Sequence, residues 1–120
     1  RNQNIDFRGP IPYREMLNEL HKSTLLITDS GGFQEEATYL GLPTLVLRKS
    51  TERKEAISEG SCQLVMEPQI ELEYLVENLL ANTNGKYVQM SRASTVFGTG
   101  NSAERIIETI QNLDFAIAKP

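Results

Sequence analysis

The feature that most constrains this chain is a pair of short, uninterrupted apolar runs, each followed by a helical pattern. The runs are Leu25 to Thr28 and Thr44 to Leu47, and their lack of polar alternation is typical of strands that are covered on both faces. Between them, Phe33, Ala37 and Leu40 recur at the spacing of one buried helical face. Strands and helices that alternate in this way predict an α/β fold, in which helices flank a parallel sheet.

The remaining elements follow from the same periodicities. We expect further strands at residues 5–7 and 62–65, helices at 13–20 and 70–80, short helical pieces within 51–59 and 86–91, and a last helix capped by Asn101. The core face of that last helix is predicted to comprise Ala103, Ile106, Ile107, Ile110 and Leu113. The chain contains no repeat, and its 120 residues predict a single domain over residues 1–120.

Composition excludes several classes of protein. With 39% hydrophobic and 23% charged residues, the chain has the composition of a soluble globular domain. A net charge of −4 argues against a nucleic-acid partner, and no apolar run approaches the about 18 residues that a membrane span needs. A lone cysteine suits the cytoplasm. Because the chain begins with Arg1 rather than Met, we expect it to be a piece of a longer protein.

The segment Thr28 to Ala37 joins the first apolar run to its helix through small residues. The first N–H groups of a helix have no internal partner, and the helix dipole favours negative charge there, so this junction can bind an anion. Gly31 and Gly32 let a ligand approach the backbone, while Ser30 adds a hydroxyl that could also cap the helix, as could Asp29. The alternative is that the glycines form only a tight turn.

A basic segment, Arg48 to Lys54, follows the second apolar run. In parallel α/β sheets, ligands bind beyond the carboxyl ends of the strands, which meet at one edge. The basic segment and the Ser30–Gly32 turn should therefore lie at the same edge. A positive loop beside a helix N-terminus predicts a ligand that carries phosphates.

Helical geometry separates two adjacent glutamates. At about 100° per residue, Glu36 lies roughly 60° from Phe33, at the margin of the buried stripe, whereas Glu35 lies on the far side and should be solvated. A carboxylate repels phosphate but accepts hydrogen bonds from sugar hydroxyls, so we interpret Glu36 as a ribose ligand. The alternative is an acid that complements the helix dipole or forms a salt bridge.

Taken together, these motifs resemble the UDP-N-acetylglucosamine 2-epimerase family. The resemblance rests on an ordered set: Pro10 to Tyr13, Thr28 to Gly32, Gln34 to Ala37, Leu40 to Pro43, Arg48 with Thr51 to Arg53, and Phe97 to Ile106. It covers essentially the whole chain, which corresponds to most of the C-terminal half of those enzymes. It implies a GT-B-type fold of two Rossmann-like lobes, of which this chain would be the C-terminal, UDP-binding lobe.

The resemblance also implies roles for individual residues. Ser30, Gly31 and Gly32 would hold the diphosphate, Glu36 the ribose hydroxyls, and Arg53 would lie near the nucleotide. The acids and bases that remove and return the C2 proton belong to the N-terminal lobe, so no catalytic residue is expected in this chain. No metal and no cofactor are implied. The parent enzyme would be a cytoplasmic homodimer that acts on UDP-N-acetylglucosamine in polysaccharide biosynthesis, either epimerising it or releasing the free sugar.

Three positions depart from the family pattern. Met16 stands where the family commonly has a phenylalanine against the uracil; a thioether can still pack on a ring. Lys54 replaces the usual proline after Thr-Glu-Arg, and Thr99 replaces a common aspartate.

Other candidate residues have structural interpretations. His21 should be a surface residue near a helix C-terminus, Cys62 a small core residue, and Tyr13 a core or rim residue that could also touch the base.

Two other functions fit parts of the pattern. One is the donor-binding lobe of a GT-B glycosyltransferase, against which Thr51-Glu52-Arg53 argues. The other is a stand-alone nucleotide-sugar-binding module.

Overall fold

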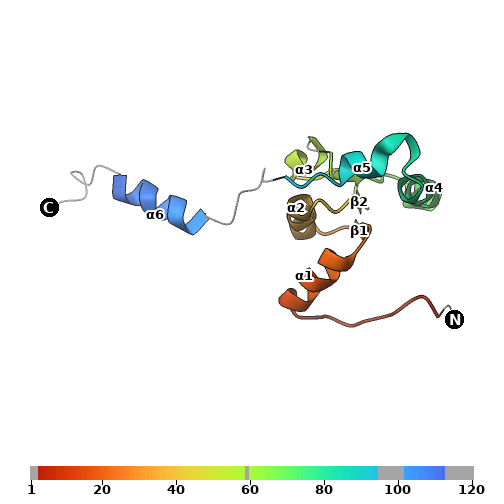
Figure 1. The fold of residues 1–120 in the computed structure, drawn as a ribbon, viewed down its shortest axis with the longest axis horizontal. Helices are drawn as coiled ribbons and strands as arrows, with labels where there is room; N and C mark the ends of the chain where they lie inside the picture. Colours follow the sequence, from red (N-terminus) through yellow and green to blue (C-terminus); the bar gives the residue numbers. More distant parts are fainter. Residues whose placement is uncertain (1–2, 59, 95–101, 113–120) are drawn as a thin grey trace.

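A computed structural model describes residues 3–58, 60–94 and 102–112 (Figure 1). The elements in chain order are α1 (Tyr13–Lys22), β1 (Leu26–Thr28), α2 (Gly31–Leu40), β2 (Thr44–Val46), α3 (Lys54–Ser58), β3 (Cys62–Leu64), α4 (Pro68–Leu80), the 3-10 helix η1 (Thr83–Gly85), α5 (Lys86–Met90) and α6 (Ser102–Asn112). Helix α4 begins earlier than its apolar stripe, because proline is favoured in the first turn, where its missing N–H costs nothing.

The three strands form a parallel sheet in the order β1-β2-β3. Leu26 aligns with Thr44, and Thr44 with Cys62. Figure 1 shows α2 on one side of the strands and α4 on the other. Leu20 of α1 packs with Ala37 of α2, and Met90 of α5 packs with Leu79 of α4. The predicted α/β architecture, a parallel sheet flanked by helices, is confirmed.

Central strand β2 anchors the core on both faces of the sheet. Leu45 points to one face and its neighbours Thr44 and Val46 to the other, and all three are fully buried. The hydrophobic clusters are Leu45 with Val65, Leu79 and Met90; Leu20 with Ala37 and Leu42; and Val46 with Ala56 and Cys62. Cys62 is therefore the core residue that the sequence predicts.

Gly41 ends α2 in the left-handed conformation, with a φ of 70°, as glycine at this position commonly does. An added Cβ would lie 2.5 Å from the carbonyl oxygen of Ser91 and 2.9 Å from the backbone nitrogen of Ala93. The Ser94 N–H also donates to the carbonyl of Thr38, at 3.0 Å. Gly41 is thus required both for its φ and for the close approach of the chain after α5.

The predicted strand at residues 5–7 is wrong. These residues have no regular secondary structure, and Ile5 and Phe7 are 52% and 72% exposed. A strand needs a neighbouring strand to complete its hydrogen bonds, and the described sheet is formed by β1, β2 and β3 alone. Arg8, which follows, is instead held by ion pairs to Asp6 and to Glu19 on α1.

The core face assigned to the last helix is also wrong for the described residues. Helix α6 forms as expected, but Ala103 is exposed, and Ile106, Ile107 and Ile110 are 59%, 55% and 49% exposed. Figure 1 shows α6 apart from the sheet and its flanking helices. Periodicity predicts an apolar helical face but not the surface that covers it. Asn101 and Leu113 lie outside the described residues.

The described helices are all too short or too polar to cross a lipid bilayer.

Candidate functional site

The Ser30–Gly32 turn lies where β1 passes into α2. Ser30 is the N-cap residue of α2, with φ −80° and ψ 129°, but its side chain makes no capping hydrogen bond. The Ser30 N–H instead donates to Thr28 Oγ1, at 3.0 Å. The capping role considered for Ser30 is therefore not seen, and the start of α2 keeps N–H groups that a bound anion can use.

Arg53 lies directly against this turn. A Cβ added to Gly31 would come within 2.5 Å of Arg53 Nη1 and 2.7 Å of its Cζ. A larger residue at position 31 would displace the guanidinium, the flexible end of the Arg53 side chain, from its place over the first turn of α2. At Gly32 the nearest atom to an added Cβ is Ser30 Oγ, at 3.9 Å, an ordinary contact. The structure thus brings together the turn and the basic segment at one sheet edge, as the sequence predicts.

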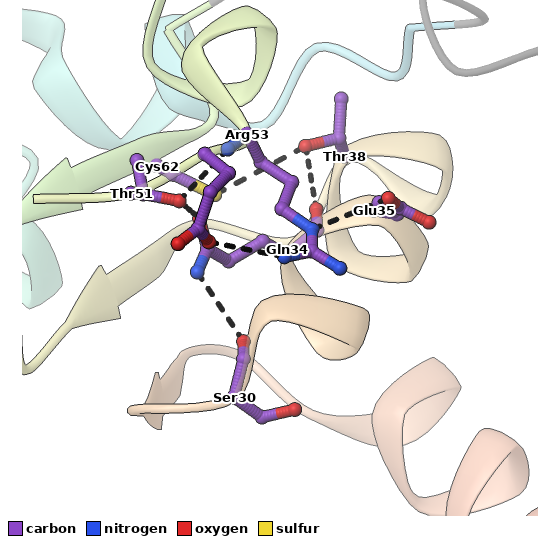
Figure 2. Close-up of polar contacts among 8 residues, drawn as sticks. Ser30, Gln34, Glu35, Thr38, Thr51, Arg53 and Cys62 are labelled. Carbon is purple, nitrogen blue, oxygen red and sulfur yellow. Dashed lines mark hydrogen bonds and ion pairs between the residues drawn. The ribbon is translucent and has the colours of Figure 1, made fainter.

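Acidic side chains hold the Arg53 guanidinium in place. Its Nε donates to Glu35 Oε1 and its Nη1 to Glu52 Oε2, each at 3.3 Å (Figure 2). Glu35 was predicted to be solvated; its side chain is 46% exposed and also forms this ion pair. Such exposed pairs are weak and screened by salt, so a phosphate could replace these carboxylates at Arg53.

One carboxylate oxygen of Glu36 accepts a hydrogen bond, and the other has no partner among the described residues. Oε1 accepts a hydrogen bond from the Tyr13 hydroxyl, whereas Oε2 is buried and has no hydrogen-bond partner among the described residues. The bond to Glu36 raises the pKa of Tyr13, with smaller contributions from burial and from the negative charge of Glu36. An unsatisfied buried carboxylate oxygen is costly unless a donor from a ligand or water reaches it.

Tyr13 belongs to this arrangement more closely than sequence reasoning suggested. Tyr13 is 62% exposed, so it is not a core residue, and its hydroxyl reaches across from α1 to Glu36 on α2. No pattern in the sequence pairs these residues, because they are 23 positions apart.

Met16 is half-buried on α1 and packs against the cluster of Leu20, Ala37 and Leu42. It also lines a cavity of about 450 Å³ with residues of the segment that precedes α1, among them Arg8 and Ile11. Its proposed place against a base stays a prediction.

Gln34 is the residue that the sequence analysis missed. It is fully buried, donates from Nε2 to the carbonyl of Ser30 at 3.3 Å, and accepts from Thr51 Oγ1 at 2.8 Å (Figure 2). A signal was present: Gln34 precedes the buried Ala37 by three positions, so it lies on the inner face of α2.

A second buried polar group lies beyond Gln34 along α2. Thr38 Oγ1 donates to the carbonyl of Gln34 at 2.7 Å and lies 2.8 Å from Ser61 Oγ. Burial raises the pKa of the adjacent Cys62 thiol, so the thiol stays protonated at neutral pH. These groups tie α2 to the start of β3. The described residues include no group of three or more His, Cys, Asp or Glu side chains placed to hold a metal ion.

An uncapped helix start beneath an arginine can hold phosphate, and a half-buried carboxylate nearby can accept hydroxyls. On a parallel α/β sheet, these features are typical of a Rossmann-like lobe.

The comparisons with known proteins identify the family. The model of the UDP-N-acetylglucosamine 2-epimerase family matches residues 1–111, and the chain belongs to this family. It is 38% identical over 110 residues to the UDP-N-acetylglucosamine 2-epimerase of Escherichia coli K12, covering 92% of the chain and 29% of that enzyme. The chain thus spans less than a third of the length of such relatives.

Solved structures agree in fold. A UDP-GlcNAc 2-epimerase from Neisseria meningitidis bound to UDP-GlcNAc matches with a TM-score of 0.77 and 37% identity, over 87% of this chain and 28% of that one. An S. aureus protein in a co-structure with UDP matches with a TM-score of 0.79 and 35% identity, over 92% and 29%. The predicted fold class, a Rossmann-like lobe of GT-B type, is confirmed.

Proposed function

We propose that this chain is the UDP-binding, C-terminal lobe of an enzyme that acts on UDP-N-acetylglucosamine, either epimerising it at C2 or releasing the free sugar and UDP. The observation that carries the proposal is the Arg53 guanidinium lying over Gly31 at the uncapped start of α2. Solved relatives that bind UDP or UDP-GlcNAc support it. In this proposal the enzyme is a cytoplasmic homodimer of polysaccharide biosynthesis that needs no cofactor or metal.

The phosphates of UDP take the place of carboxylates around Arg53. Ser30, Gly31 and Gly32 offer the diphosphate backbone N–H groups and a hydroxyl, and Arg53 neutralises its charge by leaving Glu35 and Glu52. The same groups stabilise the charge that develops on UDP as it leaves the sugar. Proton transfer at C2 is assigned to carboxylates of the N-terminal lobe, so this chain holds the leaving group.

The ribose hydroxyls donate hydrogen bonds to the Glu36 carboxylate. A carboxylate accepts two hydroxyl donors, one on each oxygen. Oε2 is buried and unsatisfied within the described chain, and Oε1 holds a hydroxyl already, that of Tyr13. The Tyr13 phenol marks where one ribose hydroxyl binds and moves aside when the nucleotide enters. Met16, on the same helix as Tyr13, is assigned to the uracil.

A titration of UDP into the ¹⁵N-labelled chain tests this assignment. The amides of Ser30, Gly31, Gly32 and Glu36 should move first, because they line the proposed nucleotide site. The matched control is uridine, which should leave the turn amides nearly unchanged because it carries no phosphate. Shifts confined to residues 87–99 would contradict the proposed site.

A further inference from the structure

The Gln34 side chain links the two segments of the proposed nucleotide site through a continuous series of hydrogen bonds. At one end Nε2 donates to the Ser30 carbonyl, at 3.3 Å. At the other end Thr51 Oγ1 donates to Gln34 Oε1, at 2.8 Å, and itself accepts the Arg53 N–H, at 3.0 Å. Both ends of the series are backbone atoms, one in the Ser30–Gly32 turn and one in the 51–53 loop (Figure 2).

We propose that Gln34 and Thr51 are positioning residues for nucleotide binding, which set the distance between the Ser30–Gly32 turn and Arg53. The inference rests on the proposed function, and it assigns to these side chains no contact with the ligand. Neither carries a charge, and both are buried, with Gln34 at 0% and Thr51 at 9% exposure. They act by holding the backbone of the residues that touch phosphate.

The neutral series and the ion pairs of Arg53 have different properties. The pairs with Glu35 and Glu52 involve half-exposed or exposed carboxylates, so salt screens them and phosphate can replace them. The Gln34–Thr51 hydrogen bond lies inside the protein, where water and salt compete little with it. The backbone of Arg53 therefore stays fixed while its guanidinium exchanges a carboxylate for a phosphate.

The Arg53 guanidinium packs directly on the Ser30–Gly32 turn. An added Cβ at Gly31 would lie 2.5 Å from Arg53 Nη1, so the guanidinium already rests on the turn. If the 51–53 loop moved, the Arg53 backbone would shift relative to the helix start, and the side chain would need another rotamer to reach the same phosphate. Misplacement of a binding group by about 1 Å can cost a large part of its effect.

Three variants separate this positioning role from a general contribution to folding. Thr51→Val keeps the shape and removes the hydroxyl, Thr51→Ser keeps the hydroxyl, and Gln34→Leu removes the amide. UDP and uridine affinities are measured by NMR titration of the full chain, and folding is checked by thermal unfolding. Because Gln34 is fully buried and its variant could unfold, Thr51→Val, at the edge of the core, is the decisive change.

We expect Thr51→Val and Gln34→Leu each to weaken UDP binding about tenfold. Their affinity for uridine should stay within about twofold of the native value. Thr51→Ser should bind UDP with close to native affinity. The variant that combines Thr51→Val with Gln34→Leu should bind UDP no more weakly than either single variant, because both substitutions break the same series of hydrogen bonds. The positioning role would be overturned if Thr51→Val bound UDP with native affinity, or if it lost affinity for UDP and uridine equally. It would also be overturned if Thr51→Ser bound UDP as weakly as Thr51→Val. A native chain that binds no UDP would instead overturn the proposed function, and the inference with it.

Discussion

At the scale of single residues, Tyr13 and Glu36 form the most unusual contact of the site. A phenol and a carboxylate share one hydrogen bond, while the second carboxylate oxygen is buried without a partner in the described chain. We interpret the Tyr13 hydroxyl as a stand-in for a sugar hydroxyl, which would bind the Glu36 carboxylate in its place. The pair has a measurable consequence, since the bond persists only while the phenol is protonated.

The Tyr13 phenol should lose its proton at a higher pH than a free tyrosine, because its pKa is raised chiefly by the bond to Glu36. A group whose pKa is higher in the folded state adds stability that is fully present below the unfolded pKa, about 10 for tyrosine, and that is lost as pH rises through the folded value. Following the assigned Tyr13 ring signals by NMR against pH measures the shift. In Glu36→Gln the pKa should return toward its ordinary value; an unchanged titration would contradict the pairing.

At the scale of elements, the two glycines that open α2 have different reasons to be glycine. Gly31 leaves space for Arg53, whereas a Cβ at Gly32 would meet only Ser30 Oγ, at 3.9 Å. The sequence places these glycines side by side and gives no reason to distinguish them. The difference arises because the 51–53 loop approaches α2 at one of the two positions.

Gly32→Ala should therefore be more stable than Gly31→Ala by up to about 1 kcal/mol, the size of the ion-pair contribution that a displaced Arg53 would lose. The helix preference of alanine is the same at both positions and cancels from the difference. Urea unfolding of the two variants measures the difference. The Arg53 side-chain Nε–H signal serves as an internal check: it should shift in Gly31→Ala and stay in place in Gly32→Ala. Equal stabilities with equal Nε–H shifts would show that Arg53 does not rest on Gly31.

At the scale of the whole molecule, the proposed site is one wall of a cleft. The residues assigned to UDP lie on exposed or half-buried positions at one edge of the sheet, whereas small-molecule sites usually enclose most of the ligand. The chain spans 29% of the E. coli relative, and under the proposed function the opposite wall and the proton-transfer groups belong to the N-terminal lobe.

The 120-residue chain alone should therefore bind UDP at least about tenfold more weakly than the same residues joined to a complete N-terminal lobe. It should show no conversion of UDP-N-acetylglucosamine. Calorimetric titration of both forms, together with an assay for released UDP and for the 2-epimer, checks this. Turnover by the chain alone would contradict the assignment of all proton transfer to the other lobe.

The sequence by itself determined the three strands of the sheet and the helices that flank them, the glycine turn at the start of α2, and the family. These depend on local properties, namely the period of apolar residues, the glycines after a buried strand, and the spacing of short motifs. Local pattern was wrong for residues 5–7 and for the burial of α6, because both depend on what lies next to the segment in space.

Only the tertiary structure decided which side chains meet. Arg53 rests on Gly31, Gln34 is joined to Thr51, and Tyr13 reaches Glu36. Gln34 and Thr51 are 17 positions apart, and Tyr13 and Glu36 are 23 apart. Such pairs depend on how each helix and loop packs on the sheet, a set of angles and distances that no local period encodes. The sequence thus singled out the glycine turn that we propose as the phosphate site, and only the packing around it decided how that turn is held.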